Sequence, residues 1–159
     1  LRHDPLAVGL VILMIEWMTQ QHYLGSIKDD GDIDPLFKSL LKHHWIEESQ
    51  HAKLDTLIVD ALAEGRSEAE IDKAVDEVFE IATFLDGGLK AQAEFNVNAL
   101  EKAINQTVLN REEIIAQQHQ AGRWTFIGSG LVHQRFKATV ESISQRAAAR
   151  FAEAAPVFA

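Results

Sequence analysis

Apolar residues recur at steps of three and four along most of the chain, which is the spacing of amphipathic helices. No run of alternating apolar and β-branched residues is long enough to predict a sheet. Caps mark three helix starts. Asp4-Pro5 and Asp34-Pro35 each place a capping side chain before a proline, and Ser67-Glu68-Ala69-Glu70 forms a capping box. We therefore predict an all-α protein.

The predicted helix from Pro35 to Glu64 carries the most informative pattern. Its three-and-four stripe is apolar at both ends and polar in the middle, which predicts a bundle-facing helix with a polar centre. Burying a polar group without a partner costs roughly 2–7 kcal/mol, so this centre needs a partner, and a metal ion is the simplest one. The stripe consists of Phe37, Leu41, His44, Glu48, His51, Asp55, Ile58 and Leu62.

A first helix is expected from Asp4-Pro5 to about Gly25. Its apolar stretch, residues 6 to 18, is too short to span a bilayer and fits a central core helix. Glu16 is the exception on this helix, and carboxylates are almost never fully buried unless they are paired. We therefore expect Glu16 to meet the polar centre of the second helix, whereas His22 fits a helix-end or surface histidine.

The second half of the chain offers fewer candidate ligands. Asp86-Gly87-Gly88 is expected to interrupt or bend the third helix, and the helical pattern then resumes to a turn at either Asn110 or Gly122. Glu94 and Glu101 lie on the edge of its apolar face, where a solvated role and a ligand role are equally consistent with the pattern.

A last helix is expected to run to about Ala155, before Pro156. His133 falls within its apolar arc, together with Phe136 and Val140. This phase predicts that His133 faces the same cavity as the polar centre and favours a ligand role. His119, near a helix end, is a weaker candidate.

Composition narrows the function classes. The 159 residues suit a single domain, 1–159, and because the chain begins at Leu1 rather than Met, a further N-terminal segment or helix is an open alternative. Cysteine is absent, so any metal must be held by His, Asp or Glu. The net charge of −9 argues against a nucleic-acid partner, and we expect no membrane partner and a cytoplasmic location. The three tryptophans, Trp17, Trp45 and Trp124, are candidates for a homodimer surface.

Glu48-Ser-Gln-His51 is a Glu-x-x-His pair, and Glu16 precedes it on the previous helix. These residues resemble the first half of the ferritin-like di-iron carboxylate proteins, in which two helices supply a Glu each and two supply a Glu-x-x-His each. The resemblance implies a four-helix bundle with an additional or bent helix, iron or manganese as one or two bound ions, and dioxygen as a partner. It further implies that Glu48 bridges two metals, that Glu16 and His51 bind one each, and that Asp55 orients His51.

The second half departs from this pattern, because no second Glu-x-x-His follows Gly65. His133, with Glu94 or Glu101, would have to replace it. His44-x-x-x-Glu48 is also similar to a motif of haemerythrin-like bundles, although only one helix matches. Three functions therefore stay open: an oxidase or oxygenase-like metalloprotein, a metal-binding or storage protein without turnover, and a metal-free structural bundle.

Overall fold

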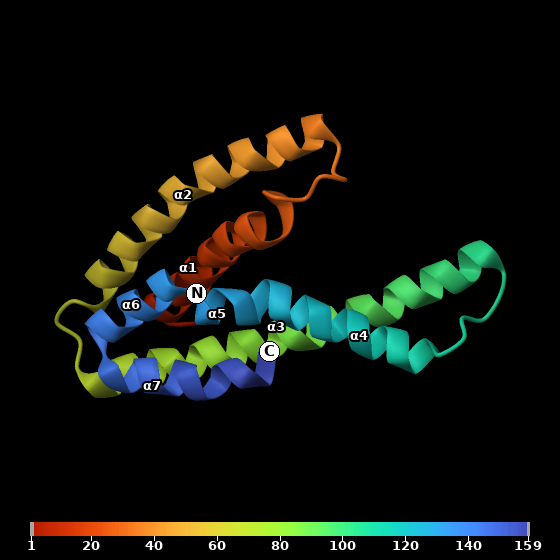
Figure 1. Cartoon of the computed structure of the whole chain (residues 1–159). Coiled ribbons are helices and arrows are strands. Elements are labelled where there is room, and N and C mark those ends of the chain that lie inside the picture. The colour runs from red at the N-terminus through yellow and green to blue at the C-terminus, as the bar shows by residue number, and fades with distance from the viewer. Residues whose placement is uncertain (1, 159) are drawn as a thin grey trace.

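The computed structural model describes residues 2–158, and their regular structure is entirely helical (Figure 1). The predicted all-α class is confirmed. The α-helices are α1 (Pro5–His22), α2 (Pro35–Ala63), α3 (Glu68–Ile104), α4 (Arg111–Arg123), α5 (Ser129–Val132), α6 (Gln134–Ile143) and α7 (Gln145–Ala154). Two π-helical turns, Tyr23–Ile27 and Trp124–Gly128, and a final 3-10 turn, Ala155–Phe158, complete the fold.

Helix α1 lies at the centre of the molecule. It contacts α2 on one side and α3, α5 and α6 on the others, while α2 forms an outer edge of the molecule (Figure 1). Because α1 is apolar nearly all round, it can bury side chains against several neighbours at once. Leu6, Leu10 and Leu13 are fully buried, which confirms the prediction of a core helix.

Glycines let α5 lie close to its neighbours. A Cβ atom on Gly130 would overlap the carbonyl oxygen of Met14 on α1, and one on Gly128 would lie 2.7 Å from the carbonyl oxygen of Phe158. Since the backbones approach this closely, larger residues at either position would push the helices apart.

The predicted caps are formed. Asp4 accepts a hydrogen bond from the backbone N–H of Leu6 at 2.8 Å, and Asp34 caps α2 in the same way. The Ser67–Glu70 capping box is present, with the Ser67 backbone N–H donating to Glu70 Oε2 at 2.8 Å. Short polar side chains at these sites satisfy amides that have no partner within the helix.

The interruption expected at Asp86-Gly87-Gly88 is wrong, because α3 runs through it as one helix of 37 residues. Glycine costs only about 1 kcal/mol in a helix interior, and the packing of flanking residues such as Leu85 and Leu89 against the core outweighs that cost. The chain turns between α3 and α4 after Asn105, which takes a left-handed conformation, so the alternative with a turn at Asn110 is the correct one.

The prediction of a single last helix is also wrong, because the chain is broken there into three helices, α5, α6 and α7. His133 and Ser144 have extended backbones and each caps the helix that follows, α6 and α7 respectively. The second break lets the two helices fold back on each other, so that Phe136 and Phe151 meet edge-to-face with ring centroids 5.4 Å apart. Local hydrogen bonding by a capping side chain thus competes with continuous helix.

Candidate metal centre

The polar groups of α1 and α2 converge at one level. Glu16, Glu48 and His51 each offer one ligand atom, and these three atoms lie within 4.8 Å of one another. Ala52 of α2 is fully buried, and its small side chain lets α1 and α2 pack closely at this level. The side-chain amide of Gln20 on α1 also donates a hydrogen bond to the carbonyl of Trp45 on α2 at 3.0 Å. The predicted meeting of Glu16 with the polar centre of α2 is confirmed.

Glu48 is the hub of this centre. His51 Nδ1 donates to Glu48 Oε2 at 2.9 Å, and His44 Nε2 lies 2.8 Å from Glu48 Oε1. The side chain of Glu48 is 15% exposed, against 56% for His44 and 49% for His51. The carboxylate is therefore held under two imidazoles that face solvent.

A second group of three ligand atoms, from His44, Glu47 and Glu48, shares the same hub. Sequence reasoning missed Glu47, although it precedes His51 by one helical turn. Its Oε1 atom lies 3.1 Å from His51 Nε2. Glu47 thus takes the position expected for Asp55 as the second partner of His51.

Glu16 is the member of the centre whose carboxylate lacks a hydrogen-bond donor. Its Oε2 atom is buried, and no residue of the described chain donates a hydrogen bond to it. Burial, then the contact with Glu48, raise the pKa of Glu16 to about 7, and the charges of Glu48 and Asp55 add to the shift. Burial and the neighbouring carboxylate both favour the protonated form of Glu16 over the ionised form.

The pKa values of Glu48 and His51 shift in the directions that favour the charged form of each group. Burial alone would raise the pKa of Glu48, but hydrogen bonds from Glu16 and His51 outweigh it and hold the pKa below its usual range. The hydrogen bond to Glu48, followed by the charge of Glu47, raises the pKa of His51. Glu48 therefore holds its negative charge more firmly than Glu16 does, and the charged form of His51 is favoured beside it.

The predicted burial of the α2 stripe is wrong. Phe37, His44, His51 and Ile58 are exposed, while Glu48 and Asp55 are half-buried. Only one helix, α1, packs along most of α2, and the residues buried by α2 are Ala52, Val59 and Ala63. The sequence predicted a second packing partner for this side of α2, and residues 2–158 do not provide one.

His133 lies outside the cluster, contrary to the prediction that it faces the same cavity. Its ring stacks on Trp17 with centroids 4.7 Å apart, and its Nδ1 accepts from the backbone N–H of Arg135. Burial, helped by the charge of Arg135, lowers the pKa of His133. The break before α6 changes its helical phase, so the periodic pattern misplaces it.

The other second-half candidates also lie elsewhere. Glu94 is exposed on α3, and Glu101 accepts from the backbone N–H of Val108 at 3.0 Å. His119 Nε2 lies 2.7 Å from Asp86 Oδ1, between α4 and α3. Within residues 2–158, the grouped metal-ligand atoms come only from α1 and α2.

These donors fit a first-row divalent ion. Metal–ligand bonds of about 2.1 Å place neighbouring ligand atoms about 3 Å apart, so the observed 4.8 Å limit requires only small side-chain movements. A cation would also satisfy Glu16 Oε2, the buried acceptor that has no donor. Imidazole with carboxylates is a ligand set that suits iron or manganese.

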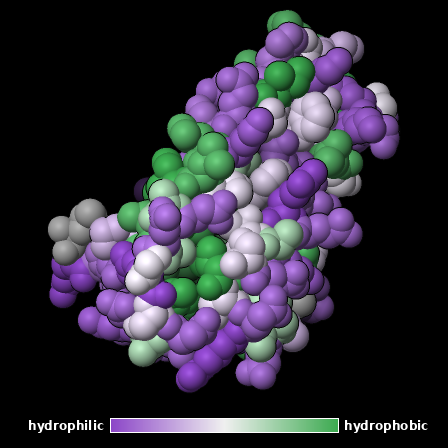
Figure 2. All heavy atoms as spheres, turned by 90° about the vertical axis from the view of Figure 1, so that its left-hand side faces the viewer, coloured by the Kyte–Doolittle hydropathy of each residue, from purple (hydrophilic) through white to green (hydrophobic). Residues whose placement is uncertain are grey.

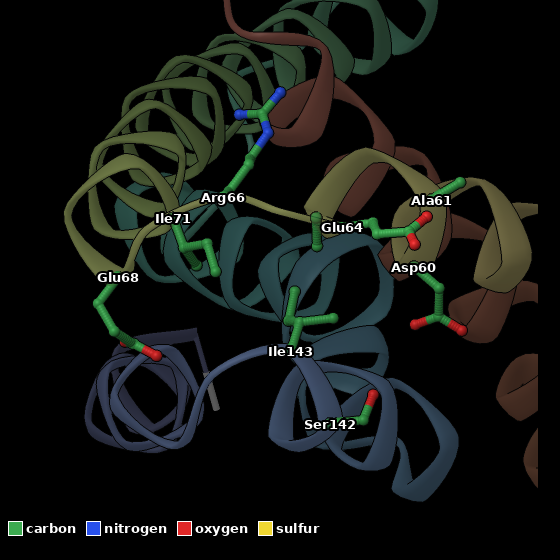
Figure 3. Close-up of a pocket in the computed structure, with 9 residues that line it drawn as sticks. Asp60, Ala61, Glu64, Arg66, Glu68, Ile71, Ser142 and Ile143 are labelled. Carbon is green, nitrogen blue, oxygen red and sulfur yellow. The ribbon is translucent and has the colours of Figure 1, made fainter.

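A pocket of about 680 Å³ lies away from this centre at the turn between α2 and α3 (Figure 3). Two of its four charged side chains are engaged by the fold: Arg66 pairs with Asp4 at 2.8 Å, and Glu68 accepts from the Ser144 hydroxyl at 2.8 Å. Arg66 and Glu68 point away from each other in Figure 3. We assign no chemistry to this pocket.

No helix in residues 2–158 combines the length and apolar character needed to cross a membrane. Comparison with known proteins gives no assignment: no family model, curated protein or solved structure matches the chain.

Proposed function

We propose that the α1–α2 pair binds iron or manganese through Glu16, Glu48 and His51. The observation that carries this proposal is the buried Oε2 of Glu16, which has no donor and lies beside a second carboxylate. Leaving a buried acceptor unpaired costs about 1–3 kcal/mol, and a bound cation removes that cost. The resemblance of Glu16 and Glu48-x-x-His51 to ferritin-like carboxylate proteins supports the same assignment.

Each residue has a distinct role in this proposal. Glu48 presents one oxygen toward His51 and the other toward His44, so it is placed to hold one ion firmly or to join two. Glu16 releases its proton as the metal binds, since a ligand must be deprotonated. Bound iron would supply electron exchange with dioxygen, which is the chemistry of an oxidase or oxygenase.

A second candidate is a metal-free polar network. It is favoured by the contacts of His44 and His51 with Glu48, which give both oxygens of this carboxylate a partner. In that case Glu16 belongs to the network in its protonated form, and the centre contributes only to the structure.

Metal analysis separates the two candidates. Protein loaded anaerobically with iron(II) or manganese(II) and then desalted should retain metal, while Glu48→Gln should lose it. Glu64→Gln is the matched control, because Glu64 is an exposed glutamate at the end of the same helix. Equal metal in all three proteins would end the assignment to Glu48. Oxygen consumption by the iron(II)-loaded protein then separates an oxidase from a storage protein.

A further inference from the structure

A stripe of exposed residues with heptad spacing, which we call the outer stripe, runs along α2. Its members are three and four residues apart without exception, and every one of them is exposed: Phe37, Leu40, His44, Glu47, His51, Leu54 and Ile58. Scattered exposed apolar residues need no explanation, and Phe84 on α3 is one such residue. A strict heptad is different, because it is the pattern of a helix that packs against another helix. Figure 2 shows hydrophobic patches among hydrophilic residues on one face of the molecule.

The order of residues in this outer stripe reads nearly the same in both directions. Two apolar residues, a histidine, a glutamate, a histidine and two apolar residues follow one another. If two copies of α2 pair antiparallel around Glu47, Phe37 lies opposite Ile58 of the second copy and Leu40 opposite its Leu54. His44 then lies opposite His51 of the second copy. A self-complementary surface of this kind is what a two-fold symmetric dimer requires.

The ligands that one chain supplies are also half of the set that a symmetric two-metal site uses. One chain supplies one Glu and one Glu-x-x-His, whereas a two-metal carboxylate site in a four-helix bundle uses two of each. Helices α1 and α2 from two copies provide four helices and the full set. The opposite side of α1 is already covered by α3, α5 and α6, so the outer side is the one left for a partner.

We propose that two copies of this chain pair antiparallel along the outer stripe of α2 and join their half-sites into one two-metal centre. This inference rests on the proposed metal binding. Helix α2 has 29 residues and is therefore about 44 Å long, and two neighbouring helices present a face about 20 Å wide. That face is of the size needed for the roughly 800 Å² that each partner buries in a stable complex.

Charge makes the pairing depend on metal. Each chain carries a net charge of −9, and the dimer brings Glu16, Glu47 and Glu48 of both copies together. Like charges at close range repel, and no lysine or arginine occupies the outer stripe. Bound cations supply the missing positive charge, so the metal-free chain is monomeric and the metal-loaded chain is dimeric.

Light scattering after size exclusion, with and without manganese(II), tests this pairing. We expect a metal-free monomer and a loaded dimer with two ions. Leu54→Lys should weaken dimerisation on the order of 100-fold, because it buries a charge in the apolar contact. Leu57→Lys is the matched control, since Leu57 is a leucine of similar exposure (59% against 55%) on the same helix but outside the outer stripe. A loaded wild type that stays monomeric, or a Leu54→Lys protein that dimerises normally, would overturn the proposal.

Cross-linking tests the antiparallel order directly. The natural chain has no cysteine, so Phe37→Cys and Ile58→Cys proteins each carry a single thiol. Mixed in the presence of manganese(II) and mildly oxidised, they should form a mixed disulfide, while neither alone forms one efficiently. Efficient cross-linking of each protein with itself would exclude the antiparallel order. Metal bound by a monomer would defeat the pairing alone, whereas wild-type protein that binds no metal would defeat the proposed function as well.

Discussion

Two clusters of histidine and carboxylate in this protein differ in their charge balance. Between α3 and α4, Asp86 is approached by His119 at 2.7 Å and by Arg123 Nε at 2.8 Å, the latter as an ion pair whose N–H is not aligned for a hydrogen bond. Between α1 and α2, Glu16 and Glu48 share a site with His51 and have no arginine or lysine partner among the described residues. A histidine near a carboxylate is therefore not enough to indicate a metal site. The excess of acceptors over donors distinguishes the second cluster.

The largest expected effect separates the two clusters by metal-dependent stability. A metal at 100 times its dissociation constant stabilises the native state by about 2.7 kcal/mol, which is roughly 5–10 °C in melting temperature for a chain of this size. Glu48→Gln should abolish this increase, while Asp86→Asn should leave it intact. Thermal unfolding with and without manganese(II) measures both, and an equal increase in all three proteins would contradict the difference between the clusters.

Without metal, Asp86→Asn should affect stability more than Glu48→Gln does. Asp86→Asn leaves Arg123 partly buried with a weaker partner, and we expect it to lower the free energy of unfolding by about 1–2 kcal/mol. Glu48→Gln should be neutral or stabilising, because it removes one of two like charges that compete for a proton. Urea unfolding in the presence of a chelator provides the comparison. A larger loss for Glu48→Gln would mean that the α1–α2 cluster is a structural network.

The second-half candidates give a smaller test of the boundary of the metal centre. His133→Ala removes the stack on Trp17 and the cap of α6, so we expect a loss of roughly 1 kcal/mol in stability with unchanged metal content. Glu94→Ala should change neither quantity, because Glu94 is exposed on α3. Metal analysis beside urea unfolding checks both variants, and loss of metal from either would restore it as a ligand.

The smallest effect is the pH dependence of the metal-free protein. The pKa of Glu16 is about 7 in the folded chain, above its ordinary value of 4.5, so the folded state binds a proton more tightly than the unfolded state. Stability should therefore rise as pH falls from above 7 toward 4.5, by less than about 1 kcal/mol because solvent screens this partly exposed group. Glu16→Gln should remove this rise. Metal affinity should change in the opposite direction and increase as pH rises through 7.

The pattern of apolar and polar positions determined the helices and several of their ends. Asp4, Asp34 and Ser67 cap the helices they were predicted to cap, because capping depends on neighbours in sequence. The meeting of Glu16 with Glu48 and His51 was also predictable, since α1 and α2 are consecutive along the chain and the spacing along two antiparallel helices sets the level of each side chain. The all-α class and the core of the centre thus follow from local information.

Only the tertiary structure decided which faces are covered and where the second half of the chain lies. Helical periodicity fixes the angles between side chains but does not say how many neighbours a helix has, so the exposed side of α2 was not foreseen. The breaks at His133 and Ser144 depend on capping bonds and on packing between Phe136 and Phe151, which compete with a continuous helix by small free energies. His133 is itself the residue at the first break, where its extended backbone takes it out of the helical phase, and its ring stacks on Trp17 instead of joining Glu48.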